Sequence, residues 1–407
     1  MTYFHGITAT LLALIWLSRV VDTALGVRTL TNISRPEWDR NPALPTGNPR
    51  VAIIVPARNE EDSIEQALQR LLSLDYANYE VIAINDSSTD RTGQIMDKVA
   101  SSSEESPRPS SGAGVDARSY TNQRLKIVHI RELPPNWMGK AHAMWTAARQ
   151  TDADWLLFTD ADVMFHPDCL RRAIAYAKAE RADHIVLLPR VLMKRPGEKM
   201  MVGFFQLLFV FGHRPWKVAD PKAKDHMGVG AFNLVRRSTY EAVGTYERLR
   251  FEVVDDMKFG KVIKNAGFRQ RVVLGDDLIA IRWAHGARGV VNNLTKNFFA
   301  VMSFEVWRAV GGSIVLAILN LTPFCGAIFV HGWARVPYCL TLVAIFALYV
   351  GLWGRDKIGP WYFFLHPVST VLIIYTVLRS MCVTLWNDGV VWRGTFYPLE
   401  ELKKGLV

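Results

Sequence analysis

The stretch "WLLFTDADVMF", residues 155–165, joins a short apolar run to two carboxylates. Residues 155–158 have the composition of a strand that is buried inside a sheet. Asp160 and Asp162 follow one residue apart, at the point where this strand would end. Aspartate is common in turns, and a carboxylate pair also supplies the oxygen ligands that Mg²⁺ and Mn²⁺ prefer. The stretch alone is compatible with a turn or with a metal site.

The surrounding sequence alternates strand and helix patterns from about residue 50 to residue 283. Strands are predicted at residues 51–56, 79–86, 124–130 and 154–162, and helices at residues 61–74, 90–100, 139–150 and 166–180. Such alternation predicts an α/β fold in which helices cover a parallel sheet. Ligands of these sheets bind beyond the carboxyl ends of the strands, where the polar clusters "ARNE", "NDSSTD" and "DAD" fall.

The rest of the chain is more apolar than a soluble protein of 407 residues usually is, with 50% hydrophobic residues. Residues 309–330, 336–354 and 358–378 contain no Asp, Glu, Lys or Arg. Each stretch is close to the ~20 residues that a membrane-spanning helix needs. We therefore predict transmembrane helices within residues 309–386. The apolar N-terminus predicts a retained anchor over residues 1–24, with a surface-lying amphipathic helix as the alternative.

The net charge of +10 does not by itself indicate a nucleic-acid partner, because basic residues cluster beside the apolar stretches. The positive-inside rule then places the central region in the cytosol. The cluster after the first stretch consists of Arg19, Arg28, Arg35, Arg40 and Arg50. The four cysteines form no CxxC pair, so neither a disulfide framework nor a zinc site is indicated.

Several segments interrupt the α/β pattern. Residues 101–123 are rich in Ser, Pro and Gly and predict a disordered surface insertion in an α/β domain of residues 50–290. Residues 200–212 are strongly apolar but too short to span a bilayer, which leaves a buried core helix or an interfacial helix. Residues 291–308 predict an amphipathic interfacial segment, and residues 387–407 form a basic tail whose side of the membrane stays open.

Two further polar clusters accompany the aspartate pair. Asp86 ends the second predicted strand at the edge where ligands bind, and Asp90 has the position of a helix N-cap. Lys140 follows Gly139 at a predicted helix start. This lysine is either an exposed side chain or part of an anion site, for instance for a diphosphate.

A last acidic pair, Asp255 and Asp256, precedes a predicted helix in "VVDDMKFGKVIKNAG". Acidic side chains in a first helical turn interact favourably with the helix dipole. A carboxylate within reach of an acceptor hydroxyl would also serve as a general base. Each cluster has an ordinary structural explanation when it is taken alone, whereas the combination and the order of the clusters are specific.

Together the clusters closely resemble inverting glycosyltransferase family 2. The matching stretches, within about residues 51–267, are "VAIIVPARNEEDSIEQAL", "VIAINDSSTDRT", "GKAHAMWTAA", "LLFTDADVMFHPDCL", "GVGAFNLVRRSTYEAVG" and "VVDDMKFGKVIKNAG". The apolar C-terminal stretches and "GARGVVNNLTKNFF" resemble a membrane-associated branch that glycosylates lipids, such as the hopanoid-associated, carotenoid and ceramide glycosyltransferases. The resemblance implies a GT-A fold, a Rossmann-like mixed sheet sandwiched by helices, with N-terminal and C-terminal transmembrane helices.

The resemblance also implies which residues bind the nucleotide-sugar. Pro56, Arg58 and Glu60 would line the nucleotide pocket, with Glu60 near the ribose. Asp86 would contact the base, and Lys140 would contact the donor.

The same resemblance assigns the metal and the chemistry. Asp162 would be the main ligand of Mg²⁺ or Mn²⁺, with Asp160 bonded to the ribose or to the metal shell. Asp256 would be the catalytic base, and Asp255 would stand beside it in the family's acidic pair.

Three positions depart from the family pattern. Asn85 stands where the second-strand motif usually has a first aspartate, and Asp255 replaces the glutamate of the acidic pair. Processive members carry Gln-x-x-Arg-Trp, but here Ile279 precedes Arg282 and Trp283. The missing glutamine argues for the transfer of a single sugar rather than for polymer synthesis.

The expected function is therefore a metal-dependent, inverting transfer of one sugar from a nucleotide-sugar, with a UDP-sugar as the first expectation, to a hydroxyl of a membrane lipid. The expected location is integral to the bacterial cytoplasmic membrane, with the catalytic domain in the cytosol and no nucleic-acid partner. The alternatives are a processive polysaccharide synthase and a non-catalytic membrane scaffold with a decayed nucleotide site.

Overall fold

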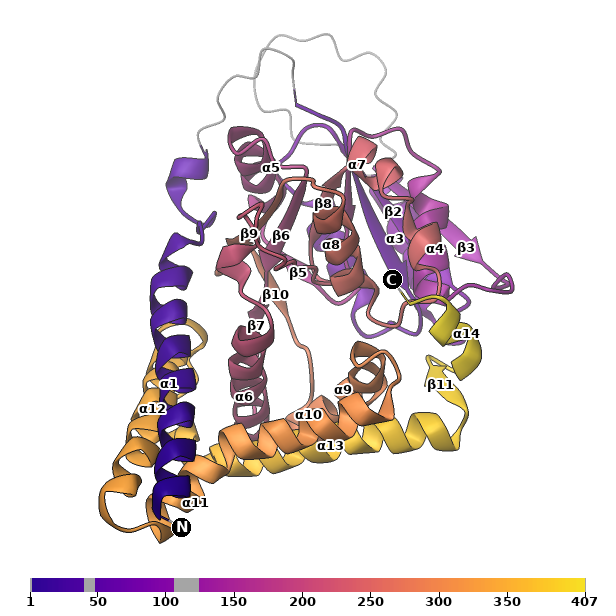
Figure 1. Cartoon of the computed structure of the whole chain (residues 1–407). Helices are drawn as coiled ribbons and strands as arrows, with labels where there is room; N and C mark the ends of the chain where they lie inside the picture. The colour runs from indigo at the N-terminus through magenta and orange to yellow at the C-terminus, as the bar shows by residue number, and fades with distance from the viewer. Residues whose placement is uncertain (1, 40–47, 106–123, 407) are drawn as a thin grey trace. The chain divides into compact units, whose positions relative to one another are not determined.

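The computed structural model describes residues 2–39, 48–105 and 124–406, which form two compact units (Figure 1). The sheet unit contains the described residues from 31 to 190 and from 227 to 281. The helical unit contains residues 2–30, 191–226 and 282–406. Most of the predicted insertion at 101–123 lies outside the described residues, but its first five residues are helical because α3 (Thr92–Glu105) continues to Glu105.

The sheet unit is built on seven strands in the order β3-β2-β1-β4-β8-β6-β9. The strands are β1 (Val51–Ala57), β2 (Tyr79–Asp86), β3 (Leu125–Ile130), β4 (Trp155–Phe158), β6 (His184–Leu188), β8 (Asn233–Arg236) and β9 (Gln270–Leu274). Strand β1 runs parallel to β2 and β4, whereas β8 runs antiparallel to both β4 and β6. The mixed sheet that the family resemblance implies is therefore confirmed. The prediction of a parallel sheet, made from the alternation of strands and helices, is wrong at β8.

Helices cover both faces of this sheet, which explains why β1 is buried at every position. Helices α2, α3 and α5 lie against one face through the main apolar cluster, and α4 packs on β1 and β2. The helices of this unit are α2 (Ile64–Leu72), α3, α4 (Gly139–Ala148), α5 (Cys169–Ala179), α7 (Arg237–Ala242) and α8 (Asp255–Asn265), with short 3₁₀ turns at Pro36–Asp39 and Tyr246–Leu249. A small sheet joins β5 (Met164–Phe165), β10 (Ile279–Ile281) and β7 (Arg190–Val191).

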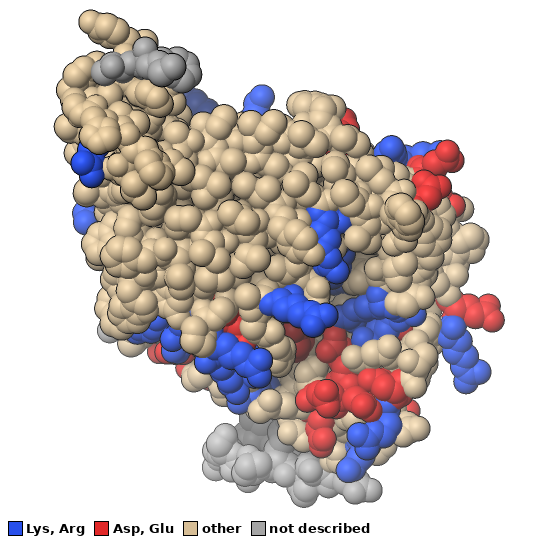
Figure 2. Space-filling view, turned by 90° about the horizontal axis from the view of Figure 1, so that it is seen from below, with Lys and Arg blue, Asp and Glu red and all other residues tan. Residues whose placement is uncertain are grey.

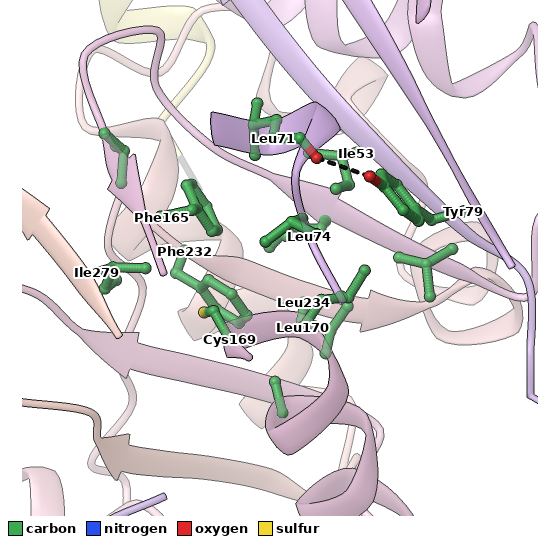
Figure 3. Packing of buried hydrophobic residues seen from close by; sticks show 14 of the residues in the cluster. Ile53, Leu71, Leu74, Tyr79, Phe165, Cys169, Leu170, Phe232, Leu234 and Ile279 are labelled. Carbon is green, nitrogen blue, oxygen red and sulfur yellow. Dashed lines mark hydrogen bonds between the residues drawn. The ribbon is translucent and has the colours of Figure 1, made fainter. Parts of the chain in front are cut away.

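The main core fills the space between the sheet and the helices of one face (Figure 3). Leu71 and Leu74 meet Ile53 there, and the Tyr79 hydroxyl donates to the Leu71 carbonyl at 2.9 Å. Cys169 is fully buried in the same cluster, as expected for a thiol that behaves as a small apolar side chain. The core holds the strand ends, and therefore the polar loops that follow them, on a rigid support.

The residues before β1 also belong to the sheet unit. The Ile33 amide donates to the Leu274 carbonyl at 2.8 Å. The Arg172 guanidinium binds both carboxylate oxygens of Asp39, and this pair holds the pKa of Asp39 below its ordinary value, the hydrogen bonds outweighing the opposing effect of burial. The segment that follows the predicted anchor is thus docked on the α/β domain.

The helical unit contains four helices that are long and apolar enough to cross a membrane, over His5–Thr29, Val306–Phe329, Gly332–Gly354 and Pro360–Trp386. Its helices are α1 (Thr2–Gly26), α6 (Pro196–Gly212), α9 (Gly286–Val301), α10 (Val306–Asn320), α11 (Thr322–Phe329), α12 (Arg335–Asp356), α13 (His366–Trp386) and α14 (Leu399–Lys404). Short 3₁₀ turns occupy Val27–Thr29, Pro215–Lys217, Gly332–Ala334 and Pro360–Leu365, and a hairpin joins β11 (Gly389–Trp392) to β12 (Thr395–Pro398). The apolar spans expected from the sequence are confirmed as helices.

Two helix layers make up this unit. Helices α1 and α12 pack along each other, and α13 packs along α9 and α10. The second layer runs across the direction of the first in Figure 1. Polar groups join the layers: buried His366 is hydrogen-bonded to Tyr349 of α12 and to Asn320 of α10. These bonds satisfy polar side chains that would otherwise be costly to bury.

The short apolar stretch at residues 200–212 forms most of α6, which belongs to the helical unit and not to the sheet unit. Met201, Phe204 and Leu207 are buried, and Leu207 packs in a cluster with Tyr349 and Ile358. The helix starts with a capping box in which the Glu198 carboxylate accepts from the Arg195 amide at 3.1 Å. Much of its apolar surface is therefore covered by other helices.

Candidate active site

Three neighbouring strands, β2, β1 and β4, place their polar C-terminal loops at one edge of the sheet. Ala57 at the end of β1 pairs with Asn85 of β2, and Arg58 and Glu60 follow it. Phe158 ends β4, and Asp160 follows two residues later. The three clusters that the sequence predicts at this edge are thus adjacent, as expected for an open α/β sheet.

Lys140 ties this edge to the acidic pair of α8. Its ammonium lies 2.7 Å from Asp160 Oδ1 and 3.9 Å from Asp255 Oδ1. Burial alone would lower the pKa of Lys140, but the charges of Asp160, Asp255 and Asp256 outweigh burial and hold that pKa above its ordinary value. Lys140 therefore stays charged. The structure brings together four residues that span more than a hundred positions of the sequence.

Asp256 is held by backbone amides rather than by the lysine. Its Oδ2 accepts from the Gly230 amide at 2.8 Å, and its Oδ1 accepts from the Met257 amide at 2.7 Å. Burial raises the pKa of Asp256, against the opposing charge of Lys140. The two acids of the pair thus have different surroundings: Asp255 faces the cation, and Asp256 is a fixed carboxylate with increased proton affinity.

Gly230 links the two acidic clusters and was missed by the sequence analysis. Its amide donates to Asp256, and its carbonyl accepts from the Asp160 amide at 3.1 Å. A Cβ at this position would overlap the Asp160 carboxylate. Only glycine fits at such a close approach. The residue lies in the stretch "GVGAFNLV", but its importance is visible only once both of its carboxylate neighbours are known.

A small pocket, too narrow for a water molecule in this conformation, lies among these side chains. Lys140, Asp160, Asp255 and Asp256 contribute its polar lining. The rest of the lining comes from Met144, Phe158, Thr159, Gly230, Asn233 and Tyr246. Tyr246 and Asn233 thus lie beside the acidic groups. No pattern in the sequence had singled out these two residues.

Asp162 lies in the same loop as Asp160, and its side chain faces the solvent. Removal of water by the surrounding protein raises the pKa of Asp162 to about 6, and the negative charges of Asp160 and Glu60 act in the same direction. Its side chain is nevertheless exposed, so a ligand can reach it. Carboxylates that repel one another around an open position are a donor set suited to a hard divalent cation. Within the described residues no group of three or more His, Cys, Asp or Glu side chains is arranged to hold a metal by itself.

The residues expected around the nucleotide lie at the β1 and β2 loops. Pro56 is a buried residue of β1, and Arg58 Nη1 lies 4.0 Å from Asp86 Oδ2. Gly139, at the start of α4, lies so close to Asp86 that a Cβ there would crowd the carboxylate. Glu60 accepts from the Ser63 hydroxyl at 3.0 Å, at the entrance to α2.

Two neighbouring polar residues have structural roles. The Asn85 amide oxygen accepts from the Ser88 amide, and its Nδ2 is hydrogen-bonded to His129. Asp90 accepts from the Thr92 amide at 2.9 Å, at the first residue of α3, as the helix-cap interpretation predicts. Asn85, which stands where the family usually has an aspartate, therefore stabilises the turn after β2 through its side chain.

Comparison with known proteins agrees with this geometry. A family model described as glycosyl transferase family 2 matches residues 52–244. A 4,4'-diaponeurosporenoate glycosyltransferase of Staphylococcus haemolyticus is 23% identical over 250 residues, which are 61% of this chain and 60% of the relative. A beta-monoglucosyldiacylglycerol synthase of Synechocystis is 30% identical over 169 residues, which are 40% of this chain and 31% of the relative. The matches thus span less than two thirds of either relative.

A solved structure shows the same fold. It is the mannosyltransferase PcManGT from Pyrobaculum calidifontis, in complex with GDP-Man and Mn²⁺. The match has a TM-score of 0.54 and covers 90% of this chain and 99% of that one, at 18% identity. The family match therefore identifies residues 52–244 as a glycosyl transferase family 2 domain, and the likeness to the solved structure shows that the fold is GT-A.

Proposed function

We propose that the enzyme transfers one sugar, with inversion, from a nucleotide-sugar to a hydroxyl group of a membrane lipid. The observation that supports this proposal most is the position of Lys140 between Asp160 and Asp255, next to the separately held Asp256. One cation and a fixed carboxylate at the ligand-binding edge of the sheet are the groups that a displacement at a sugar carbon requires.

The donor would bind at the loops of β1, β2 and β4. Arg58 and Asp86 form the part of this edge that we assign to the nucleotide, with Asp86 toward the base and Glu60 near the ribose. Lys140 would stabilise the charge that grows on the departing diphosphate, and its raised pKa keeps it cationic for this purpose. We expect a UDP-sugar as the donor.

Asp162, with help from Asp160, would hold Mg²⁺ or Mn²⁺. Burial is the main cause of the raised pKa of Asp162, and the negative charges of Asp160 and Glu60 add to it. A bound cation would relieve this repulsion, which supports the assignment. When bound, the cation would supply positive charge to the diphosphate leaving group. Asp160 would then exchange part of its interaction with Lys140 for the metal shell or the ribose.

Asp256 would be the general base. Its carboxylate takes the proton of the acceptor hydroxyl while that oxygen forms a bond to the anomeric carbon and the bond to the nucleotide diphosphate breaks. Attack from the face opposite to the nucleotide inverts the configuration. The raised pKa of Asp256 makes it a stronger proton acceptor than an ordinary carboxylate, and the two amide contacts fix its direction.

The acceptor assignment is supported by the helical unit and by the chemistry of the relatives. Four helices are long and apolar enough to cross a bilayer, and a broad uncharged surface bordered by Lys and Arg is visible in Figure 2. The names of the two relatives refer to a carotenoid acid and to a diacylglycerol lipid. A lipid acceptor in the bacterial cytoplasmic membrane, with the site in the cytosol, follows as our proposal.

Transfer of a single sugar is favoured over polymer synthesis by the position of Ile279. This residue stands where processive members have glutamine, and its side chain is fully buried in the apolar core of the sheet unit. Arg282 lies 3.7 Å from buried Glu198, and the Trp283 ring packs on Phe205. A polar contact with a growing sugar chain from position 279 is therefore unavailable.

Calorimetry on the purified full-length protein tests the donor proposal. UDP- and GDP-sugars are titrated with and without Mn²⁺ or Mg²⁺. At least one nucleotide-sugar should bind in a metal-dependent way, and Asp162→Asn should weaken it by about tenfold or more. Asp152→Asn, a charge change at an exposed residue, should leave affinity unchanged. If no nucleotide-sugar binds with either metal, the decayed-scaffold alternative is favoured.

A further inference from the structure

Arg379 is a charged residue in an otherwise uncharged helix. Helix α13 contains no other Lys, Arg, Asp or Glu residue. It belongs to a segment that is apolar enough to cross a membrane. A charged side chain in such surroundings is costly unless polar or charged partners stabilise it.

The contacts of Arg379 are with neutral groups. Its Nη1 donates to the Thr295 hydroxyl at 2.6 Å and to the Asn292 amide oxygen at 3.5 Å, both on α9. Among the described residues, no carboxylate lies within ion-pair distance of this guanidinium. Arg379 therefore brings a positive charge that this part of the protein does not balance.

Several arginines of the helical unit differ from Arg379 because they have a carboxylate partner. The ion pairs Arg214–Asp225, Arg282–Glu198 and Arg308–Glu305 each give an arginine a carboxylate within 4 Å, at 2.7, 3.7 and 3.1 Å. A guanidinium carries five N–H donors, and Arg379 uses one nitrogen for its two protein contacts. The remaining donors are available to an anionic ligand.

The direction of the guanidinium is fixed from α9. The Thr295 hydroxyl donates to the Val291 carbonyl at 2.7 Å, which turns its lone pairs toward Arg379. One residue further along α13, the Ser380 hydroxyl accepts from the Phe299 amide at 2.9 Å. These bonds set the register between α9 and α13. The Arg379 side chain is therefore held at the edge between the two helices.

The exposed face of α13 around Arg379 has the composition of a membrane–water interface. Tyr375 lies four residues before Arg379 and Trp386 seven residues after it, so all three share one helix face. Tyr375 is exposed, and Trp386 is 91% exposed. Tyrosine and tryptophan are enriched where the hydrocarbon core meets the lipid headgroups. On the neighbouring helix α9, Lys296 lies over the Trp392 ring at 4.5 Å.

We propose that Arg379, oriented by Thr295 and Asn292, binds the phosphate headgroup of an anionic membrane phospholipid. A guanidinium fork matches the oxygens of a phosphate diester, and the flanking aromatic side chains would lie at the same depth. The site would anchor α13 to the lipid and fix how deeply the helical unit is immersed. This proposal concerns a lipid that is not transformed, and it does not depend on the glycosyl transfer proposed above.

Thermal unfolding of the full-length protein in a neutral detergent tests the site without any donor sugar. Phosphatidylglycerol, phosphatidylcholine or inorganic phosphate is added, and the change in Tm is measured. A ligand that binds the folded state raises Tm in proportion to its affinity. Phosphatidylglycerol should raise the Tm of the wild-type protein more than phosphatidylcholine does, and Arg379→Gln should remove about half or more of that difference.

Matched variants decide the interpretation. Arg308→Gln removes an equal charge from an arginine that has a carboxylate partner, and it should keep the full phosphatidylglycerol effect. Arg379→Lys keeps the charge but not the fork, and it should retain an intermediate effect even if Arg379→Gln does not fold. An undiminished effect in the Arg379 variants contradicts the proposal. An equal effect of inorganic phosphate also contradicts it, because the site would then bind free anions.

Discussion

Lys140 decides the electrostatics of the active site at the residue scale. It is close to two carboxylates at once, and the pKa of the lysine is raised in spite of burial. Asp256 is instead fixed by backbone amides. In the proposed function, Lys140 would act on the donor and Asp256 would act as the base on the acceptor. We therefore expect substitutions at the two acids of α8 to have different consequences.

Asp256→Asn should reduce kcat by more than about a hundredfold, because an amide cannot accept the acceptor proton. Binding of the nucleotide-sugar should remain within a few-fold of the wild type, since Asp256 is not on the donor side. Steady-state kinetics together with calorimetry would check this expectation. Asp152→Asn serves as the control. Near-native turnover by a folded Asp256→Asn protein would show that another group is the base.

The pH dependence of metal binding should report on Asp162. Its pKa is raised to about 6, so the group is protonated in the folded protein at pH values where an ordinary aspartate is ionised. Because the cation needs the ionised carboxylate, affinity for Mn²⁺ should rise about tenfold per pH unit up to pH 6 and then level off. Calorimetry between pH 5 and 8 measures this profile. The rise should disappear in Asp162→Asn, and an identical profile in that variant would remove Asp162 from the metal site.

The raised pKa of Asp162 also affects the stability of the metal-free protein. A carboxyl group with a raised pKa in the folded state contributes stability while it is protonated, and the contribution is lost as pH rises from about 4 to about 6. Metal-free Asp162→Asn should therefore have a Tm at pH 7 that is equal to or above that of the wild type. A Tm of metal-free Asp162→Asn below that of the wild type would instead indicate that the carboxylate stabilises the fold.

At the element scale, the loop before β8 links the loop that carries Asp160 to the acidic pair of α8. Gly230 contributes an amide to one and a carbonyl to the other. Gly230→Ala should lower kcat by about a hundredfold, since displacement of a catalytic group by an ångström has effects of this size. Gly212→Ala, at a glycine with nothing within 4 Å, should leave kcat unchanged. Equal activity of both variants would mean that this contact is dispensable.

Most individual elements could be predicted from local patterns. The run "VAIIVPA" is apolar throughout because both of its faces are covered, and the helix at Ile64–Leu72 has its apolar residues on one side. The antiparallel insertion of β8 between β4 and β6 could not be predicted, because its partners lie far away in the sequence. The structure brings Asp160 and Asp255 to the Lys140 ammonium, whereas the close approach of Gly230 to Asp160 is visible only in the tertiary contacts.

At the scale of the whole molecule, the layered helical unit bears on membrane topology. One N-terminal and three C-terminal spans would place the C-terminal tail on the side opposite to the catalytic domain. In the structure, α10 and α13 pack together and run across α1 and α12, so both layers cannot be perpendicular to the same bilayer (Figure 1). Hydropathy alone could not predict this arrangement, because it measures length and composition and not direction.

We therefore expect the C-terminal tail to lie on the same side as the catalytic domain. Cysteines at Glu400 and, as a reference, at Lys126 are introduced after Cys325, Cys339 and Cys382 have been replaced by serine. Both new cysteines should react with a membrane-impermeant maleimide in inverted vesicles and not in intact cells. Labelling of Glu400→Cys in intact cells would show that α13 crosses the membrane and that the tail lies outside.

The products of the reaction test most directly whether the enzyme transfers one sugar from a nucleotide-sugar to a membrane lipid. Membranes that contain the wild-type enzyme or Asp256→Asn are incubated with a panel of nucleotide-sugars and Mn²⁺, and their lipids are identified by mass spectrometry. The wild type should produce a lipid that has gained one sugar unit, and Asp256→Asn should not. A ladder of products with repeated sugar additions would contradict the transfer of a single sugar. The absence of a new glycolipid with every donor would contradict transfer to a lipid.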